Sequence, residues 1–199
     1  MSYMVTWTKE KIKEAFADIK PMYDKLSEES WNDYVNSLPY GQAIPPKGRF
    51  YDNKRKDQFT AFVTQQRNKA LESLSAYRTN IDNAMSFAPT DEALRAVQAF
   101  SLRNPDSMTK EEYSAEVGRL MTRYGENYSI YMGLYDMAVK AGLRGLSKHP
   151  LATEAENIDH AKELVIRSFN GASMAYHDAP SDGQKAMFNL CVDQCLPEE

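Results

Sequence analysis

Cysteine is scarce in this chain, which has only two in 199 residues. Cys191 and Cys195 lie four residues apart near the C-terminus, in a segment whose apolar residues have helical spacing. A disulfide bond is difficult to close within one regular helix, and C-x-x-x-C is a weak pattern for zinc. We therefore expect two reduced thiols and a cytoplasmic protein.

Long apolar runs are missing as well. No stretch approaches the roughly 20 apolar residues that a membrane-spanning helix requires. The N-terminal residues become charged before any apolar run develops, which argues against a secretory signal. Glycine and proline occur nine times each, too rarely for a protein of many short strands and turns. These absences predict a protein that makes no membrane contact.

Motifs of catalysis and of cofactor binding are also lacking. The chain has no G-x-S-x-G nucleophile motif and no phosphate-binding loop of the G-x-x-x-x-G-K-[ST] or G-x-G-x-x-G type. Glu156, His160 and Glu163 have the spacing of one helical face, but they lack the E-x-x-H spacing of carboxylate-bridged bundles. We expect no catalytic residue, no metal and no cofactor. An enzyme with a site assembled from scattered Asp, Glu and His is the weakest of three functional hypotheses.

Neither sign of charge is in large excess. The formal net charge is −4, which argues against nucleic-acid binding by the whole surface and leaves a local basic patch open. Apolar residues make up 42% and charged residues 26% of the chain, as in ordinary globular proteins. The length suffices for one sizeable core, so we expect a single helical domain over residues 1–199.

What the chain does have is helical periodicity along most of its length. A first apolar stripe runs from Ile12 to Leu26, where Pro21 is expected to kink or split the helix. The longest stripe, from Phe59 to Met85, predicts a helix of about 30 residues, or about 45 Å. The last helix is predicted from a stripe of four residues, Met187, Leu190, Cys191 and Gln194.

Helix starts are marked by capping residues. Three S/T-x-x-E/Q capping boxes and one simpler N-cap precede apolar stripes, at Thr109, Thr153, Ser181 and Thr90 respectively. No segment alternates convincingly between apolar and polar residues, as a half-buried strand would. The sequence therefore predicts an all-α fold, a compact bundle of about seven or eight helices.

One irregular stretch, residues 39–53, interrupts the helices. It holds three of the nine prolines and two of the nine glycines, and it is longer than most connections between helices. If the chain divides, we place the boundary here. An N-terminal helical hairpin, residues 1–38, would then precede a main bundle of residues 54–199.

The end of this stretch is the strongest local candidate for binding an anionic partner. It combines five cations with two aromatic rings: Lys47, Arg49, Phe50, Tyr51, Lys54, Arg55 and Lys56. Cations neutralise phosphates and aromatic faces stack on bases, so the segment suits single-stranded nucleic acid or an acidic protein surface. Three of the cations stand at the expected start of the long helix, where the macrodipole prefers acids. The alternative is a solvated loop that keeps the protein soluble.

Four tyrosines form the second candidate surface: Tyr124, Tyr128, Tyr131 and Tyr135. Their spacings of four, three and four place the rings on one stripe of an α-helix, unless Gly125 ends that helix. The stripe has three interpretations, namely a bundle core, an interface with a subunit or partner, and a base-stacking platform. Because four hydroxyls need partners or water, we expect this face at the edge of the core.

The leading functional hypothesis is a non-enzymatic protein that acts through protein–protein contacts. It would serve as a structural component of an assembly, an adaptor or an inhibitor, with a protein partner or by self-association. Small helical proteins without motifs also fit viral or mobile-element genomes. The alternative is nucleic-acid binding through the segment from Lys47 to Lys56.

Overall fold

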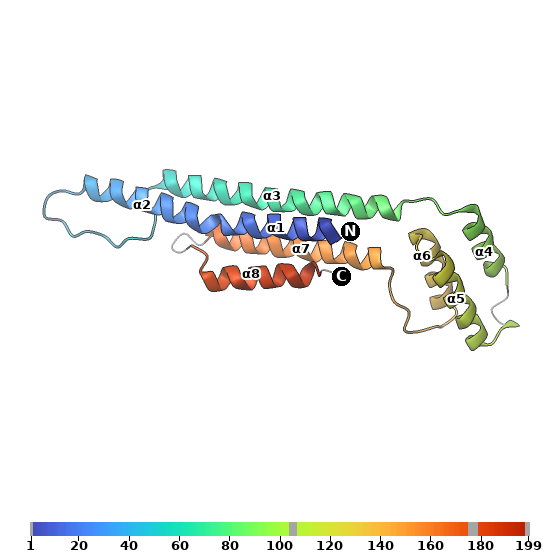
Figure 1. Ribbon diagram of the computed structural model, residues 1–199. Helices are drawn as coiled ribbons and strands as arrows, with labels where there is room; N and C mark the ends of the chain where they lie inside the picture. Colours follow the sequence, from blue (N-terminus) through green and yellow to red (C-terminus); the bar gives the residue numbers. More distant parts are fainter. Residues whose placement is uncertain (1, 104–106, 175–178, 198–199) are drawn as a thin grey trace. The chain divides into compact units, whose positions relative to one another are not determined.

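The computed structural model describes residues 2–103, 107–174 and 179–197, and these residues contain helices and no β-strand. The eight helices of these ranges are α1 Ser2–Ala17, α2 Ile19–Ser37, α3 Asn53–Met85, α4 Asp91–Ser101, α5 Lys110–Tyr124, α6 Tyr128–Lys140, α7 Pro150–Met174 and α8 Asp182–Cys195 (Figure 1). The predicted all-α fold of seven or eight helices is confirmed. As far as the described ranges extend, none of these helices is long and apolar enough to cross a bilayer.

The chain forms two packed units. Unit 1 consists of residues 1–77 and 157–199, and unit 2 consists of residues 78–156. The division falls inside α3 and α7, and each of these two helices contributes residues to both units. The irregular stretch that we considered as a boundary connects α2 to α3 and lies within unit 1.

The core of unit 1 is built around aromatic rings from three helices. Phe16 of α1 stacks on Phe188 of α8 with the ring centroids 4.1 Å apart, and it meets the edge of Phe169 of α7 at 5.3 Å. Polar contacts reinforce the same packing, because Asp193 of α8 accepts ion pairs from Lys9 and Lys13 of α1. α1 near the N-terminus and α8 near the C-terminus are therefore in direct contact in unit 1.

The first apolar stripe forms two helices, as Pro21 led us to expect. They meet at Asp18, whose backbone remains helical with φ −69° and ψ −16°. Pro21 lies in the first turn of α2, where its missing N–H leaves the ladder of helical hydrogen bonds incomplete. Since only Asp18 separates α1 from α2 and the second helix continues to Ser37, residues 2–37 do not form the predicted hairpin.

Three of the four predicted capping residues mark the start of a helix. Thr109 and Ser181 form complete capping boxes with Glu112 and Gln184, and Thr90 accepts a hydrogen bond from the Ala93 amide. The box at Thr153 is wrong, because α7 begins at Pro150 and Thr153 lies inside its first turn. Proline at the first helical position needs no hydrogen-bond partner for its nitrogen.

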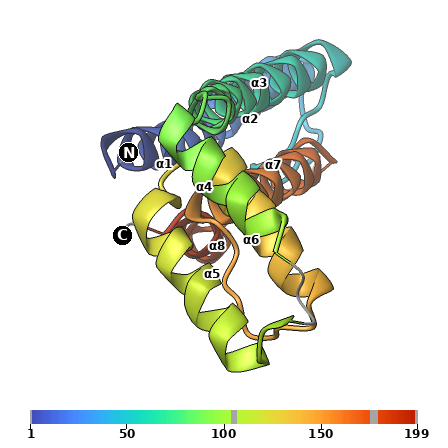
Figure 2. The same ribbon diagram turned by 90° about the vertical axis from the view of Figure 1, so that its right-hand side faces the viewer.

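Unit 2 has its own core among α4, α5 and α6. α4 and α5 each pack against α6 (Figure 2). The buried side chains of this core come from all three helices: Ala93, Phe100, Tyr113, Val117, Leu120, Ile130, Leu134 and Ala138. The rings of Phe100 and Tyr113 lie 4.9 Å apart and link α4 to α5.

Candidate functional site

The irregular stretch between α2 and α3 is folded back onto α2. Tyr23 donates a hydrogen bond to the Gly48 carbonyl at 2.8 Å, and Trp31 donates one to the Pro45 carbonyl at 3.0 Å. The ring of Tyr51 stacks on Tyr34 with the centroids 4.8 Å apart. Gly48 has φ +96°, a conformation that glycine adopts without strain. These contacts give the loop a defined course along the helix.

Its predicted binding residues contact other parts of unit 1. Lys47 pairs with Glu28 of α2 at 2.9 Å and lies 4.8 Å from the Trp31 ring centroid. Arg49 donates to the Tyr51 hydroxyl at 3.2 Å. Phe50 packs inward, with its ring 5.1 Å from that of Tyr23 and 5.6 Å from that of Phe59.

Arg55 is the most enclosed cation of the segment. Its guanidinium pairs with Asp33 of α2 and with Asp52 at 3.2 Å, and its side chain is 20% exposed. Lys56 is half-buried. Lys54 is exposed and has no ion pair among the residues that the structure describes. The segment therefore does not present five unpaired cations on one surface.

Asp52 explains why cations are tolerated at the start of α3. Its carboxylate accepts hydrogen bonds from the Arg55 amide at 2.8 Å, as an N-cap does, and from the Ser30 hydroxyl at 2.6 Å. Burial alone would raise the pKa of Asp52, but the hydrogen bonds from Ser30 and Arg55 hold that pKa below its usual value. The acid preferred by the helix dipole is thus supplied by the N-cap residue.

The tyrosine stripe does not lie on one helix, which corrects the sequence prediction. α5 ends at Tyr124, and Asn127 caps α6 by accepting a hydrogen bond from the Ile130 amide at 3.2 Å. Gly125 makes the tight connection possible, because a Cβ there would lie 2.2 Å from the Met121 carbonyl oxygen. Tyr124 therefore belongs to α5, and the other three tyrosines belong to α6.

The predicted position of these tyrosines at the edge of a core is confirmed. All four are half-buried, whereas the core of unit 2 receives Ile130 and Leu134 from α6. Tyr124 donates to Glu92 at 2.8 Å, and Tyr131 donates to the Ser147 carbonyl at 2.9 Å. The hydroxyls of these two residues thus find partners at the rim of unit 2.

His149 lies beside the tyrosines and caps α7. Its Nε2 donates to the Gly125 carbonyl at 3.2 Å, while its Nδ1 accepts from the Leu151 amide at 3.1 Å, an arrangement that requires the neutral imidazole. The edges of Tyr128 and Tyr131 contact the ring. Burial lowers the pKa of His149 more than its backbone hydrogen bonds raise it.

Sequence reasoning missed an exposed apolar surface on α8 of unit 1. The predicted core stripe of the last helix is wrong by one position, because Phe188 and Val192 are buried, whereas Met187 is 61% and Leu190 is 52% exposed. Both stripes are apolar, so periodicity could not decide between them. The signal available in the sequence was the width of the apolar surface of α8, which exceeds what one core contact needs.

A groove of about 560 Å³ runs beside these residues, between α7 and α8. Its α7 side includes three small residues, Ser168, Gly171 and Ala172, together with Leu164 and Arg167, and its α8 side includes Met187 and Cys191. The space above Gly171 is open, since no atom lies within 4 Å of where a Cβ would be. We call the groove together with the exposed Met187 and Leu190 the α7–α8 face.

Comparison with protein-family models, with curated proteins and with solved structures finds no match for this chain. Within the described ranges, no three His, Cys, Asp or Glu side chains are grouped so that they could hold a metal ion. Function is therefore argued from the chain's own surfaces and cavities.

Proposed function

We propose that this protein is a non-enzymatic component of an assembly and that it binds a protein chain through the α7–α8 face. The observation that carries the proposal is the exposure of Met187 and Leu190 next to a groove whose α7 side includes Ser168, Gly171 and Ala172. Flexible methionine side chains are frequent at protein-binding surfaces. Contiguous apolar surface of this kind marks interaction sites in soluble proteins.

The proposed occupant is a second copy of the chain. We call the exposed side chains of Met187 and Leu190 the ridge. This ridge lies on the same part of unit 1 as the groove beside Gly171. A two-fold axis would let each copy place its ridge against the groove of the other, as an isologous interface requires. The face is thus complementary to itself in shape, with large side chains beside small ones.

The expected association is reversible. Complete burial of one Met or Leu side chain contributes roughly 1.5–3 kcal/mol, and a two-fold dimer would bury two of each. Association costs about 4–15 kcal/mol in lost translational and rotational freedom. The surplus is small, so we expect a weak dimer that dissociates on dilution.

The test is the molar mass in solution as a function of protein concentration, measured by light scattering. We expect a concentration-dependent increase from the monomer mass of 22.7 kDa towards twice that value. The Met187→Glu variant should remain monomeric, because it places a charge at the centre of the contact. A wild-type protein that stays monomeric up to several hundred micromolar would refute the proposal.

Nucleic-acid binding is not advanced as a second function. Lys47 pairs with Glu28, and Arg55 pairs with Asp33 and Asp52. A phosphate would have to compete with these carboxylates for the same cations. No contact of the described residues favours that hypothesis over a structural role for the loop.

A further inference from the structure

We propose that unit 2 binds a small anionic molecule with an aromatic body, in a pocket formed by α4, α5 and α6. The pocket has a volume of about 580 Å³, within the range of small-molecule sites. It is independent of the α7–α8 face, because every residue that lines it belongs to unit 2. Three observations support the assignment.

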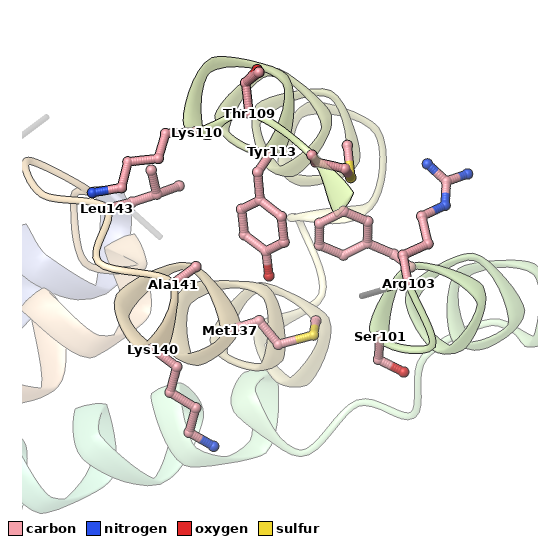
Figure 3. Close-up of a pocket in the computed structure, with 11 residues that line it drawn as sticks. Ser101, Arg103, Thr109, Lys110, Tyr113, Met137, Lys140, Ala141 and Leu143 are labelled. Atoms are coloured by element: carbon pink, nitrogen blue, oxygen red, sulfur yellow. The ribbon is translucent and has the colours of Figure 1, made fainter. Parts of the chain in front are cut away.

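The first observation is an apolar interior. Four apolar side chains line it, namely Phe100 of α4, Met108, Met137 of α6 and Leu143. Figure 3 shows Met137 and Leu143 among the lining side chains. The Phe100 ring is nearly fully buried and packs against Tyr113, so its position is fixed. The methionines are unbranched and adapt to the outline of a flat ring. This interior suits an aromatic or similarly flat apolar group.

The second observation is a hydroxyl that opens onto the pocket. Tyr113 is only 6% exposed as a residue, and its ring extends from α5 so that the hydroxyl points towards α6 near Met137 and Ala141 (Figure 3). That hydroxyl has no hydrogen-bond partner within the described part of the chain. It is therefore free to donate to a molecule that enters the pocket. A ligand that carries an acceptor would provide its partner.

The protonation state of Tyr113 suits this role. Burial raises the pKa of its phenol above the usual value of 10.0, and no nearby group opposes that shift. The hydroxyl therefore stays protonated at neutral pH and is available as a donor. An acceptor such as a sulfonyl, carbonyl or ether oxygen would complete its hydrogen bonding.

The third observation is the charge of the rim. Three cations, Arg103, Lys110 and Lys140, line the pocket, and none of its lining residues in the described ranges is acidic. Their charged ends lie outside the apolar interior (Figure 3). Lys110 and Lys140 have no ion pair within the described residues, and Arg103 only approaches Glu116 at 3.8 Å. The potential at the entrance is therefore positive and attracts an anion.

These observations define the ligand by its chemistry. A flat apolar body would lie against the apolar lining that includes Phe100 and Met137. An acceptor on that body would reach Tyr113, and an anionic group would remain at the rim near Lys110 and Lys140. An aromatic carboxylate or sulfonate of drug-like size meets all three requirements. A strand of nucleic acid does not, since its charges are spaced along a backbone that the pocket cannot enclose.

The experiment uses two fluorescent probes that differ in one charged group. Dansylglycine has an aromatic body, sulfonyl acceptors and a carboxylate, whereas dansylamide has the same body without the carboxylate. We expect saturable binding of dansylglycine to the full chain and weaker binding of dansylamide at low salt. No saturable binding of dansylglycine, or equal affinity for both probes, would overturn the proposal.

Variants then locate the bound probe. Tyr113→Phe removes only the hydroxyl and should weaken dansylglycine binding by about threefold to tenfold. The double variant Lys110→Gln/Lys140→Gln should weaken dansylglycine binding but leave dansylamide binding unchanged. Gly171→Leu, which fills the groove of unit 1, should affect neither probe. If only Gly171→Leu reduces binding, the probe occupies the α7–α8 face and the assignment is wrong.

Discussion

Ser30 of α2 donates a 2.6 Å hydrogen bond to Asp52, the residue that caps α3. The same hydroxyl accepts from the Tyr51 amide at 2.7 Å, and Ser30 is almost completely buried. One side chain thus holds the end of the loop, the helix cap and α2 together. This relationship and the surfaces described above lead to four predictions.

Replacing Ser30 by alanine should destabilise unit 1. The change removes the hydrogen bond to Asp52 and leaves the Tyr51 amide without its acceptor, which costs about 1–3 kcal/mol. Urea unfolding followed by circular dichroism measures the loss. Ser37→Ala is the matched control, because its exposed hydroxyl bonds only to the Tyr34 carbonyl within α2. Equal stability of the two variants would contradict the proposed role of Ser30.

Arg55 and Lys54 should respond differently to substitution. Arg55→Ala removes the ion pairs to Asp33 and Asp52 and should lower the melting temperature. Lys54→Ala should leave the melting temperature nearly unchanged, because Lys54 is exposed and makes no ion pair in the described structure. Both variants lose one positive charge, so a difference between them reports the contacts and not the net charge. Similar melting temperatures would mean that the Arg55 contacts contribute nothing to stability.

His149 should make stability depend on pH. Its pKa is lower in the folded state than in the unfolded state, where it is about 6.5. Below that value the unfolded chain binds more protons, so the contribution of His149 is complete above about pH 7 and is lost as the pH falls through 6.5 and below. Protonation would also end the acceptor role of Nδ1 towards the Leu151 amide.

The measurement is the melting temperature between pH 7.5 and 5, compared with that of His149→Asn. Asparagine can still cap α7 but does not titrate, so the variant should lose less stability on acidification than the wild type. His160→Asn serves as the control, because His160 is exposed on α7. If the melting temperatures of His149→Asn and of the wild type change with pH in the same way, the neutral buried histidine does not contribute to the pH dependence of stability.

Filling the groove of unit 1 should prevent self-association. Gly171→Leu places a side chain where no atom lies within 4 Å of the Cβ, so the monomer should fold normally and gain helix propensity. Gly118→Leu on α5 is the matched control, since Gly118 is also an exposed helical glycine with open space above it. Light scattering should detect dimers of the wild type and of Gly118→Leu only. Dimers of Gly171→Leu would show that the groove is not the contact.

Local sequence signals were accurate wherever the relevant interaction is itself local. Thr109 and Ser181 lie within three residues of their capping partners, and the stripe from Phe59 to Ile81 is buried along α3 as its spacing predicted. The break between α1 and α2 near Pro21 is also local, because it follows from the backbone amide proton that proline lacks. The box at Thr153 failed because His149 and Pro150 offered an earlier start to the same helix.

The candidate sites depended on contacts that spacing does not encode. Nothing near Lys47 in sequence shows that Glu28 lies beside it, or that Asp33 pairs with Arg55. The basic segment therefore resembled a free anion-binding surface. Its charges are compensated only once the loop folds back along α2. Pockets and grooves also cannot be read from spacing, because they arise where the side chains of separate helices meet.

By itself the sequence determined the helical class, most helix boundaries and the position of the tyrosines at the edge of a core. Periodicity and capping act over a few residues, so the chain carries them without reference to its fold. Only the tertiary structure decided which apolar stripe of α8 is buried and that the chain forms two units. It also placed Tyr113 in the lining of a pocket formed by α4, α5 and α6. These outcomes depend on which helices pack together, and packing is a property of surfaces brought together from separate parts of the chain.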